Sequence, residues 1–229
     1  RAGRMLDSCS SMPRVVSMNL CTDQLAWLLA DPEQLISLSR LATDARSSSL
    51  AEEAQAYPLN SGQAEEIFLS QPDVLLAGRY SDKATLSMLG SMGIRIEQFE
   101  ITNSLSQIPD QIRQMGDILQ QQRRAEQLAK EVEENLASLP PIDGTAPVAA
   151  FYYPNGYSLG ANTLGSDIVT AAGFRNLTQE LGMKGGGRLD LEQLVLEAPD
   201  ILISSPRYPG GSRSEDIMFH PAIAHYAED

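Results

Sequence analysis

The sequence lacks any run of about 18 or more apolar residues, the length at which a helix crosses a bilayer. Basic residues are also scarce, since 17 Lys and Arg against 30 Asp and Glu give the 229-residue chain a formal charge of −13. This charge repels phosphate backbones and the basic residues are scattered, so no nucleic-acid partner is expected. Apolar residues make up 42% of the chain, enough for a sizeable core. Small molecules and proteins are therefore the expected partners.

Cysteine and histidine are rare as well. Cys9 and Cys21 have no CxxC spacing, which leaves a zinc site or redox dithiol without support and predicts one disulfide or two buried thiols. His220 and His225 are too few for a His-rich metal centre. The stretch Leu6–Cys9 resembles a bacterial lipoprotein cleavage site, but its aspartate and the missing hydrophobic segment leave lipid anchoring only weakly supported. We expect any signal peptide to be absent from this sequence.

Familiar catalytic and nucleotide-binding motifs are missing. The sequence contains no GxSxG or HExxH, and the glycines of Gly182–Arg188 form neither a GxGxxG after a strand nor a phosphate-binding loop. Thirty carboxylates make chance acid–base pairs certain, so no pair can be singled out. We therefore expect a protein that is not an enzyme and carries no cofactor of its own.

Short β-type segments alternate with amphipathic helical segments along the chain. The predicted strands, rich in Val, Ile, Leu or aromatic residues, are Arg14–Met18, Leu35–Ser39, Asp73–Ala77, Ile94–Glu100, Val148–Tyr153 and Asp200–Ser204. The predicted helices are Thr22–Ala30, Ala64–Gln71, Ala84–Met92, Leu164–Ala172, Leu191–Ala198 and Glu215–Tyr226. This alternation predicts an α/β fold with mostly parallel strands.

A segment in the middle of the chain has a different pattern. Over residues 104–139 apolar residues recur at spacings of three and four, typical of an amphipathic helix, with a potential break at the polar Gln120–Arg124. Pro140 and Pro141 end this helical region. The predicted organisation is an N-terminal α/β lobe over residues 1–103, a helical connector over 104–139 and a C-terminal α/β lobe over 140–229.

An internal repeat links the two predicted lobes. Glu65–Leu76 aligns without a gap on Glu192–Ile203 at an offset of 127 residues, with five of twelve positions identical and four more exchanging apolar residues. In each copy a helix stops at Pro-Asp and leads into a buried strand. The repeat favours two pseudo-symmetric lobes.

An Arg-Tyr pair follows each repeated strand: Arg79 and Tyr80 in the first copy, Arg207 and Tyr208 in the second. Ligands of open α/β sheets bind beyond the carboxyl ends of the strands, where these pairs are expected. Arginine offers a planar fork of donors to oxyanions, and tyrosine offers a flat face and a hydroxyl. Loops expected at the same cleft add the candidate ligand-binding residues Tyr152, Tyr157 and Arg188.

Several segments, taken in order, resemble a known family. Pro13–Asp23, Leu35–Ser39, the two Pro-Asp strand entries and Gly187–Leu194 resemble the periplasmic substrate-binding proteins of ABC importers for ferric siderophores and vitamin B12. The resemblance implies two Rossmann-like lobes joined by one long helix, with the ligand between them and little hinge motion. It also implies a periplasmic location, and we expect a monomer.

The resemblance further implies what the protein binds. The expected ligand is a ferric siderophore or similar iron complex, delivered to an inner-membrane ABC permease dimer. Cobalamin and haem are alternative ligands, the latter with a tyrosine as axial ligand, and an α/β enzyme using the cleft is a further alternative. Glu65 and Glu192, the first residues of the repeat copies, are expected to dock the permease because the family uses glutamates at these positions.

The end of the sequence departs from the family pattern. Such proteins usually continue after a segment like His220–Tyr226 with a further strand and helix, so we expect the C-terminal lobe to lack them. In close relatives that tail often carries a cysteine, and Cys21 is then expected to lack its usual partner.

Overall fold

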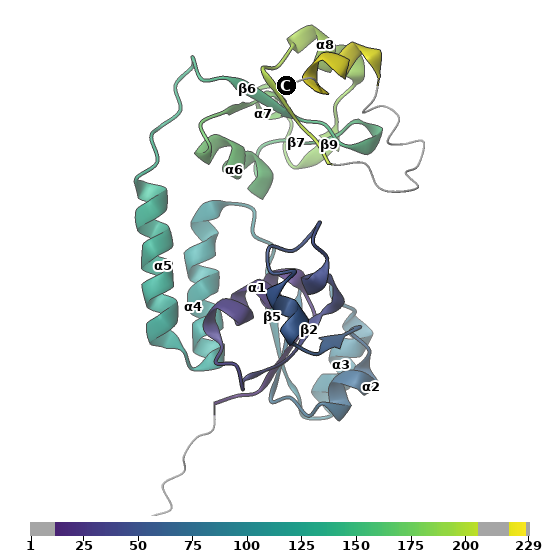
Figure 1. The fold of residues 1–229 in the computed structure, drawn as a ribbon, viewed down its shortest axis with the longest axis vertical. Helices are drawn as coiled ribbons and strands as arrows, with labels where there is room; N and C mark the ends of the chain where they lie inside the picture. Colours follow the sequence, from purple (N-terminus) through teal and green to yellow (C-terminus); the bar gives the residue numbers. More distant parts are fainter. Residues whose placement is uncertain (1–11, 206–219, 228–229) are drawn as a thin grey trace, which may run out of the picture. The chain divides into compact units, whose positions relative to one another are not determined.

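The structure is a computed structural model that describes residues 12–205 and 220–227 (Figure 1). The chain forms two compact units. Unit 1 comprises the chain up to Ile101 together with Pro109–Glu131, and unit 2 comprises Thr102–Ile108 together with the chain from Val132 onward. Each unit has its own sheet and its own core, and each is described by itself below.

Unit 1 is built on a five-stranded parallel sheet with the strand order β3-β2-β1-β4-β5. Its strands are β1 (Val15–Ser17), β2 (Leu35–Ser39), β3 (Leu59–Asn60), β4 (Val74–Gly78) and β5 (Arg95–Phe99). The chain first adds β2 and β3 on one side of β1 and then returns to add β4 and β5 on the other. The order therefore reverses between β1 and β4, the position at which such sheets leave a crevice at the carboxyl ends of their strands.

Helices cover both faces of this sheet (Figure 1). One face carries α2 (Ala64–Leu69) and α3 (Lys83–Ser91), and the other carries α1 (Leu20–Leu29) and α4 (Ile108–Leu119). On the first face Val16 and Leu75 of the sheet pack with Ile67 of α2 and Leu89 of α3, all of them buried. Burial on both faces explains why the central strands read as unbroken apolar runs.

The segment predicted as a connector is a helical hairpin rather than one long helix. The predicted break is present, because α4 ends at Leu119 and α5 (Gln122–Ala137) begins three residues later, with Gln120 in a left-handed conformation at φ 58°. The two helices fold back on each other: Arg113 pairs with Glu126 at 2.7 Å, and a Cβ on Gly116 would lie 2.2 Å from that of Ala125. Glycine at this position permits the close approach of the two helices. The expectation of one long helix is therefore wrong, because the segment forms two helices.

Unit 2 contains a three-stranded parallel sheet and a separate two-stranded antiparallel ribbon. The parallel sheet has the order β10-β6-β8, from β6 (Val148–Phe151), β8 (Arg175–Asn176) and β10 (Ile201–Ile203), and the ribbon pairs β7 (Tyr157–Leu159) with β9 (Gly186–Arg188). Its helices include α6 (Leu164–Ala171), α7 (Leu177–Glu180), α8 (Leu191–Glu197) and a 3-10 helix over Pro221–Ala227. The α/β fold with mostly parallel strands that the sequence predicts is thus confirmed.

The six predicted strands are present, whereas β3, β7, β8 and β9 were not predicted. The predicted helix Glu215–Tyr226 lies partly outside the described residues, and its described part belongs to the 3-10 helix. Cys9 also lies outside them, and Cys21 is exposed on α1.

The repeat of the sequence is a repeat of structure, down to one hydrogen bond. In unit 1 the Asp73 carboxylate accepts from the Arg14 amide at 2.7 Å, and in unit 2 the Asp200 carboxylate accepts from the Val148 amide at 2.7 Å. Each aspartate also donates its own amide to the carbonyl of the same partner. The Pro-Asp entry therefore ends a helix and ties the start of one strand to the start of its parallel neighbour.

We predict that Asp73→Ala and Asp200→Ala each lower the free energy of unfolding by about 1 kcal/mol, because a strand amide loses its acceptor. The matched variants Asp73→Asn and Asp200→Asn keep an acceptor oxygen and should lose less. Urea unfolding followed by circular dichroism measures both pairs. Equal losses for alanine and asparagine would show that the carboxylate–amide bond is not the stabilising contact.

Candidate functional site

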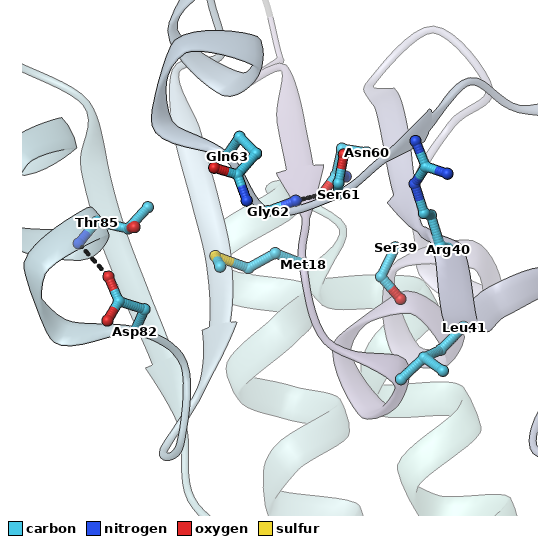
Figure 2. Close-up of a pocket in the computed structure, with 10 residues that line it drawn as sticks. All are labelled: Met18, Ser39, Arg40, Leu41, Asn60, Ser61, Gly62, Gln63, Asp82 and Thr85. Atoms are coloured by element: carbon cyan, nitrogen blue, oxygen red, sulfur yellow. Dashed lines mark hydrogen bonds between the residues drawn. The ribbon is translucent and has the colours of Figure 1, made fainter.

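A pocket of about 540 Å³ lies at the carboxyl edge of the unit 1 sheet. It is open to solvent and is lined by residues that directly follow β1, β2 and β3 and by the start of α3, as Figure 2 shows. The lining residues are Met18, Ser39, Arg40, Leu41, Asn60, Ser61, Gly62, Gln63, Asp82 and Thr85. The pocket thus occupies the edge at which a doubly wound sheet places its ligands.

The buried side-chain amide of Asn60 holds the side of the pocket that β3 forms. The Asn60 Nδ2 atom lies 2.8 Å from the Ser17 carbonyl, 3.0 Å from the Ser37 hydroxyl and 3.0 Å from the Leu38 carbonyl. Its Oδ1 atom accepts from the Gly62 amide at 3.2 Å. Through this one side chain the ends of β1 and β2 and the loop after β3 are held in one arrangement, since each unmade bond would leave a buried polar group unpaired.

A second buried polar group lies where α1 meets β2. The Asp23 carboxylate, fully buried on α1, accepts from the Ser39 amide at 3.1 Å and from the Ser39 hydroxyl at 2.5 Å. Burial raises the pKa of Asp23 above its usual value, and hydrogen bonds from Ser17 and Ser39 oppose that rise. Ser39 itself lines the pocket, so Asp23 fixes one of its walls from behind.

The remaining walls are held by local hydrogen bonds. Glu66 accepts from the Ser61 amide at 2.9 Å and from its hydroxyl at 3.1 Å, which secures the loop in which Gly62 takes a φ of +75°. Asp82 caps α3 by accepting from the Thr85 amide at 2.7 Å, and its bonds with Thr85 lower the pKa of Asp82. The carboxylate of the pocket is therefore already engaged.

Arg40 is the cationic residue of the lining. It begins the 3-10 helix Arg40–Thr43 directly after β2, and its side chain is exposed. Within the part of the chain that the structure describes, no ion pair engages its guanidinium. The pocket therefore combines amide and hydroxyl groups with one available planar cation, a donor set suited to an oxygen-rich or anionic ligand.

Arg79 and Tyr80, the predicted pair after β4, precede the pocket residue Asp82 in sequence but do not line the pocket. Arg79 forms an exposed ion pair with Glu100 at 2.6 Å, and this partner raises the pKa of Arg79. Tyr80 is 85% exposed. Since Arg79 already has a carboxylate partner, Arg40 is the better placed cation for a ligand.

In unit 2 the structure brings two predicted residues together and separates a third. Tyr157 and Arg188 are direct cross-strand neighbours on β7 and β9, and Arg188 also lies 3.4 Å from Asp190. Tyr152 is a core residue, fully buried with Leu177 and Leu194. We therefore leave Tyr152 out of the proposed ligand surface, because no face of it reaches solvent.

Of the four remaining predicted residues, the structure describes two. Arg207 and Tyr208 lie outside the described residues. Glu65 and Glu192 are both exposed and are the second residues of α2 and α8. They occupy equivalent places in the two copies of the repeat.

The residues that line the pocket were missed by the sequence reasoning. Arg40 carried a usable signal, because it directly follows the predicted strand Leu35–Ser39, and the rule applied to the repeated strands applies there as well. Asn60 and Gln63 gave little signal in the sequence, because β3 has only two residues and no recognisable strand pattern.

Neither a metal centre nor a membrane span is found in residues 12–205 and 220–227. No group of three or more His, Cys, Asp or Glu side chains among them is arranged to hold a metal ion. None of their helices has the length and apolar character needed to cross a membrane.

The chain belongs to the periplasmic binding protein family, whose sequence profile matches residues 15–227. Curated relatives are two cobalamin-binding proteins, from two strains of Halobacterium salinarum, each 23% identical over 200 residues. The match covers 85% of this chain and 54% of each relative, so the chain spans about half their length.

Solved structures of the same fold include two periplasmic proteins. A haem-binding protein of Pseudomonas aeruginosa has a TM-score of 0.72 and 20% identity, with 93% of this chain and 79% of that protein covered. The vitamin B12 binding protein of Vibrio cholerae has a TM-score of 0.63 and 17% identity, with 95% of this chain and 83% of that protein covered. At these identities the likeness establishes the fold.

We predict that Asp23→Asn becomes more stable relative to the wild type as the pH rises from about 4 to about 8. The folded-state pKa of Asp23 is raised, so its contribution is full below the unfolded pKa and is lost as the pH rises through the folded pKa. Asparagine stays neutral and keeps an acceptor for the Ser39 amide. Urea unfolding across this range measures the difference, and a difference that is constant or shrinks with pH would contradict the assignment.

Proposed function

We propose that the chain is the periplasmic solute-binding component of an ABC importer and binds a bulky metal chelate at the carboxyl edge of the unit 1 sheet. The observation that carries the proposal is the pocket at that edge, with Arg40 available in a lining of amides and hydroxyls. Membership of the periplasmic binding protein family supports a role in capture rather than catalysis.

The first ligand candidate is an iron complex that carries anionic groups, such as a ferric siderophore or haem. Arg40 supports it, because a guanidinium forms stronger, charge-assisted hydrogen bonds with a carboxylate or catecholate oxygen than with a neutral group. Tyr80, Arg79, Tyr157 and Arg188 stay proposed ligand contacts, with an exposed tyrosine available to stack or to act as an axial ligand of haem.

Cobalamin is a second candidate, favoured by a separate observation. Proteins that are 23% identical to this chain are named for cobalamin binding. The neutral amides that fringe a corrinoid match the exposed side-chain amide of Gln63 without any need for the Arg40 charge.

We predict that Arg40→Gln discriminates between these ligands. Haemin and a ferric tris-catecholate should bind about 10-fold or more weakly, since a charge-assisted hydrogen bond contributes about 1.5–3 kcal/mol. Cyanocobalamin should lose little. Titration followed by visible absorption measures all three, and the control Arg95→Gln removes a positive charge from the opposite edge of the same sheet. If none of the three chelates binds the unmodified protein, the proposed ligand class is wrong.

We propose that Glu65 and Glu192 dock the permease dimer, one glutamate to each permease subunit. Their equivalent positions in the two repeat copies support this pairing, because a two-fold partner presents the same basic residue twice.

We predict that Glu65→Ala combined with Glu192→Ala abolishes uptake and permease-stimulated ATP hydrolysis while chelate affinity stays the same. The control pair Glu53→Ala and Glu134→Ala also removes one exposed carboxylate from each unit and should leave uptake normal. Uptake assays and chelate titrations on both double variants measure the two effects. Normal uptake by the first double variant would reject the docking role, and lost chelate affinity would move these glutamates to the ligand site.

A further inference from the structure

The two repeat copies expose apolar side chains at the same two positions. Leu69 of α2 is 70% exposed and its counterpart Leu196 of α8 is 83% exposed. The preceding residues, Phe68 and Val195, are also equivalent and are 43% and 46% exposed. A single exposed leucine is ordinary on a protein surface. Here the same two positions of the repeat expose apolar side chains in two units that have separate cores and share only part of their sequence. The packing of either unit does not explain this recurrence.

Each exposed leucine shares a helix face with a proposed docking glutamate. Leu69 follows Glu65 by four residues, and Leu196 follows Glu192 by four residues, so each pair is adjacent on the surface of its helix. Ile67 and Leu194, two residues after each glutamate, point the other way and are 1% exposed. Both helices are thus anchored by one equivalent residue and present an equivalent Glu-Leu pair to solvent.

In unit 1 the pair borders a defined hollow. Glu65 and Leu69, with Ser61, Gln63 and Glu66, line an open depression of about 600 Å³. Two carboxylates beside an apolar rim match a protruding segment that carries a basic residue next to an apolar one. This depression is distinct from the pocket lined by Arg40, although Ser61 and Gln63 contribute to both.

We propose that Leu69 and Leu196 are apolar anchors of the permease-docking surface, each inserting beside a basic residue that pairs with Glu65 or Glu192. The inference rests on the proposed function and extends it from two charges to two mixed patches. Each leucine, once buried, supplies affinity that an exposed ion pair alone does not, because rim charges chiefly set the rate and register of association.

A second copy of this chain is the weaker occupant. Self-association through these patches would bring Glu65 and Glu66, or Glu192 and Glu197, against like charges in a chain whose net charge is −13. Like charges placed opposite each other across an interface disfavour it.

Site-specific photo-crosslinking in the native host tests the proposal directly. A photoreactive phenylalanine analogue replaces Leu69 or Leu196, and the matched controls replace Leu28 of α1 or Ile168 of α6, which are 47% and 48% exposed. We expect crosslinks from both repeat positions to a membrane-embedded ABC permease, identified by mass spectrometry, and none from the controls. Crosslinks to a second copy of this chain, or equal yields from all four positions, would overturn the proposal.

Binding measurements complete the test. Leu69→Ser combined with Leu196→Ser should weaken binding to the reconstituted importer about tenfold or more, whereas Leu28→Ser with Ile168→Ser should not. Titrations of haemin and cyanocobalamin should be unchanged in both double variants, which also shows that the variants are folded. Importer binding that is unaltered in the first variant rejects the leucine anchors and leaves the docking glutamates standing. Failure of chelate binding in the unmodified protein instead rejects the proposed ligand class.

Discussion

The carboxyl edge of the unit 1 sheet depends on one buried amide. Asn60 contacts the backbone at the ends of β1 and β2 and the hydroxyl of Ser37, and so joins three parallel strands beside the pocket that it lines. Parallel strands end together at one edge, and the carbonyls and amides of their last residues need partners there. Asn60 and the buried Asp23 supply partners within the protein, which leaves Arg40 and the loop residues beyond them available to a ligand.

The second organising feature is the repeat. A helix, a Pro-Asp entry and a strand recur in both units with the same carboxylate-to-amide bond to the neighbouring strand. The same unit also fixes what faces outward, because the buried Ile67 and Leu194 orient their helices. One short pattern therefore fixes the start of a strand in each sheet and presents a glutamate on the surface of each unit.

Long, strongly patterned segments made the fold predictable, and short ones did not. The strand Val74–Gly78 is an unbroken apolar run and Leu35–Ser39 is rich in Leu and Ile, so both were recognised, whereas β3 has only two residues. The hairpin turn at Gln120 was visible only as a polar break in a helical pattern. For the site, Tyr152 was predicted to face the ligand because it lies near the end of a predicted strand. In the structure Tyr152 directly follows β6 and is buried in the core of unit 2 with Leu177 and Leu194. Arg79 likewise was chosen without knowledge of its partner Glu100, which only the folded chain brings near.

The central claim, that a metal chelate binds at the carboxyl edge of the unit 1 sheet, is tested most directly by hydrogen–deuterium exchange with and without saturating haemin, cyanocobalamin or a ferric tris-catecholate. We predict that whichever chelate binds slows exchange at the amides of Arg40–Thr43 and Ser61–Gln63, while the amino edge of the same sheet, such as Arg95 at the start of β5, is unaffected. Protection confined to other segments, with these loops exchanging as in the free protein, would contradict it.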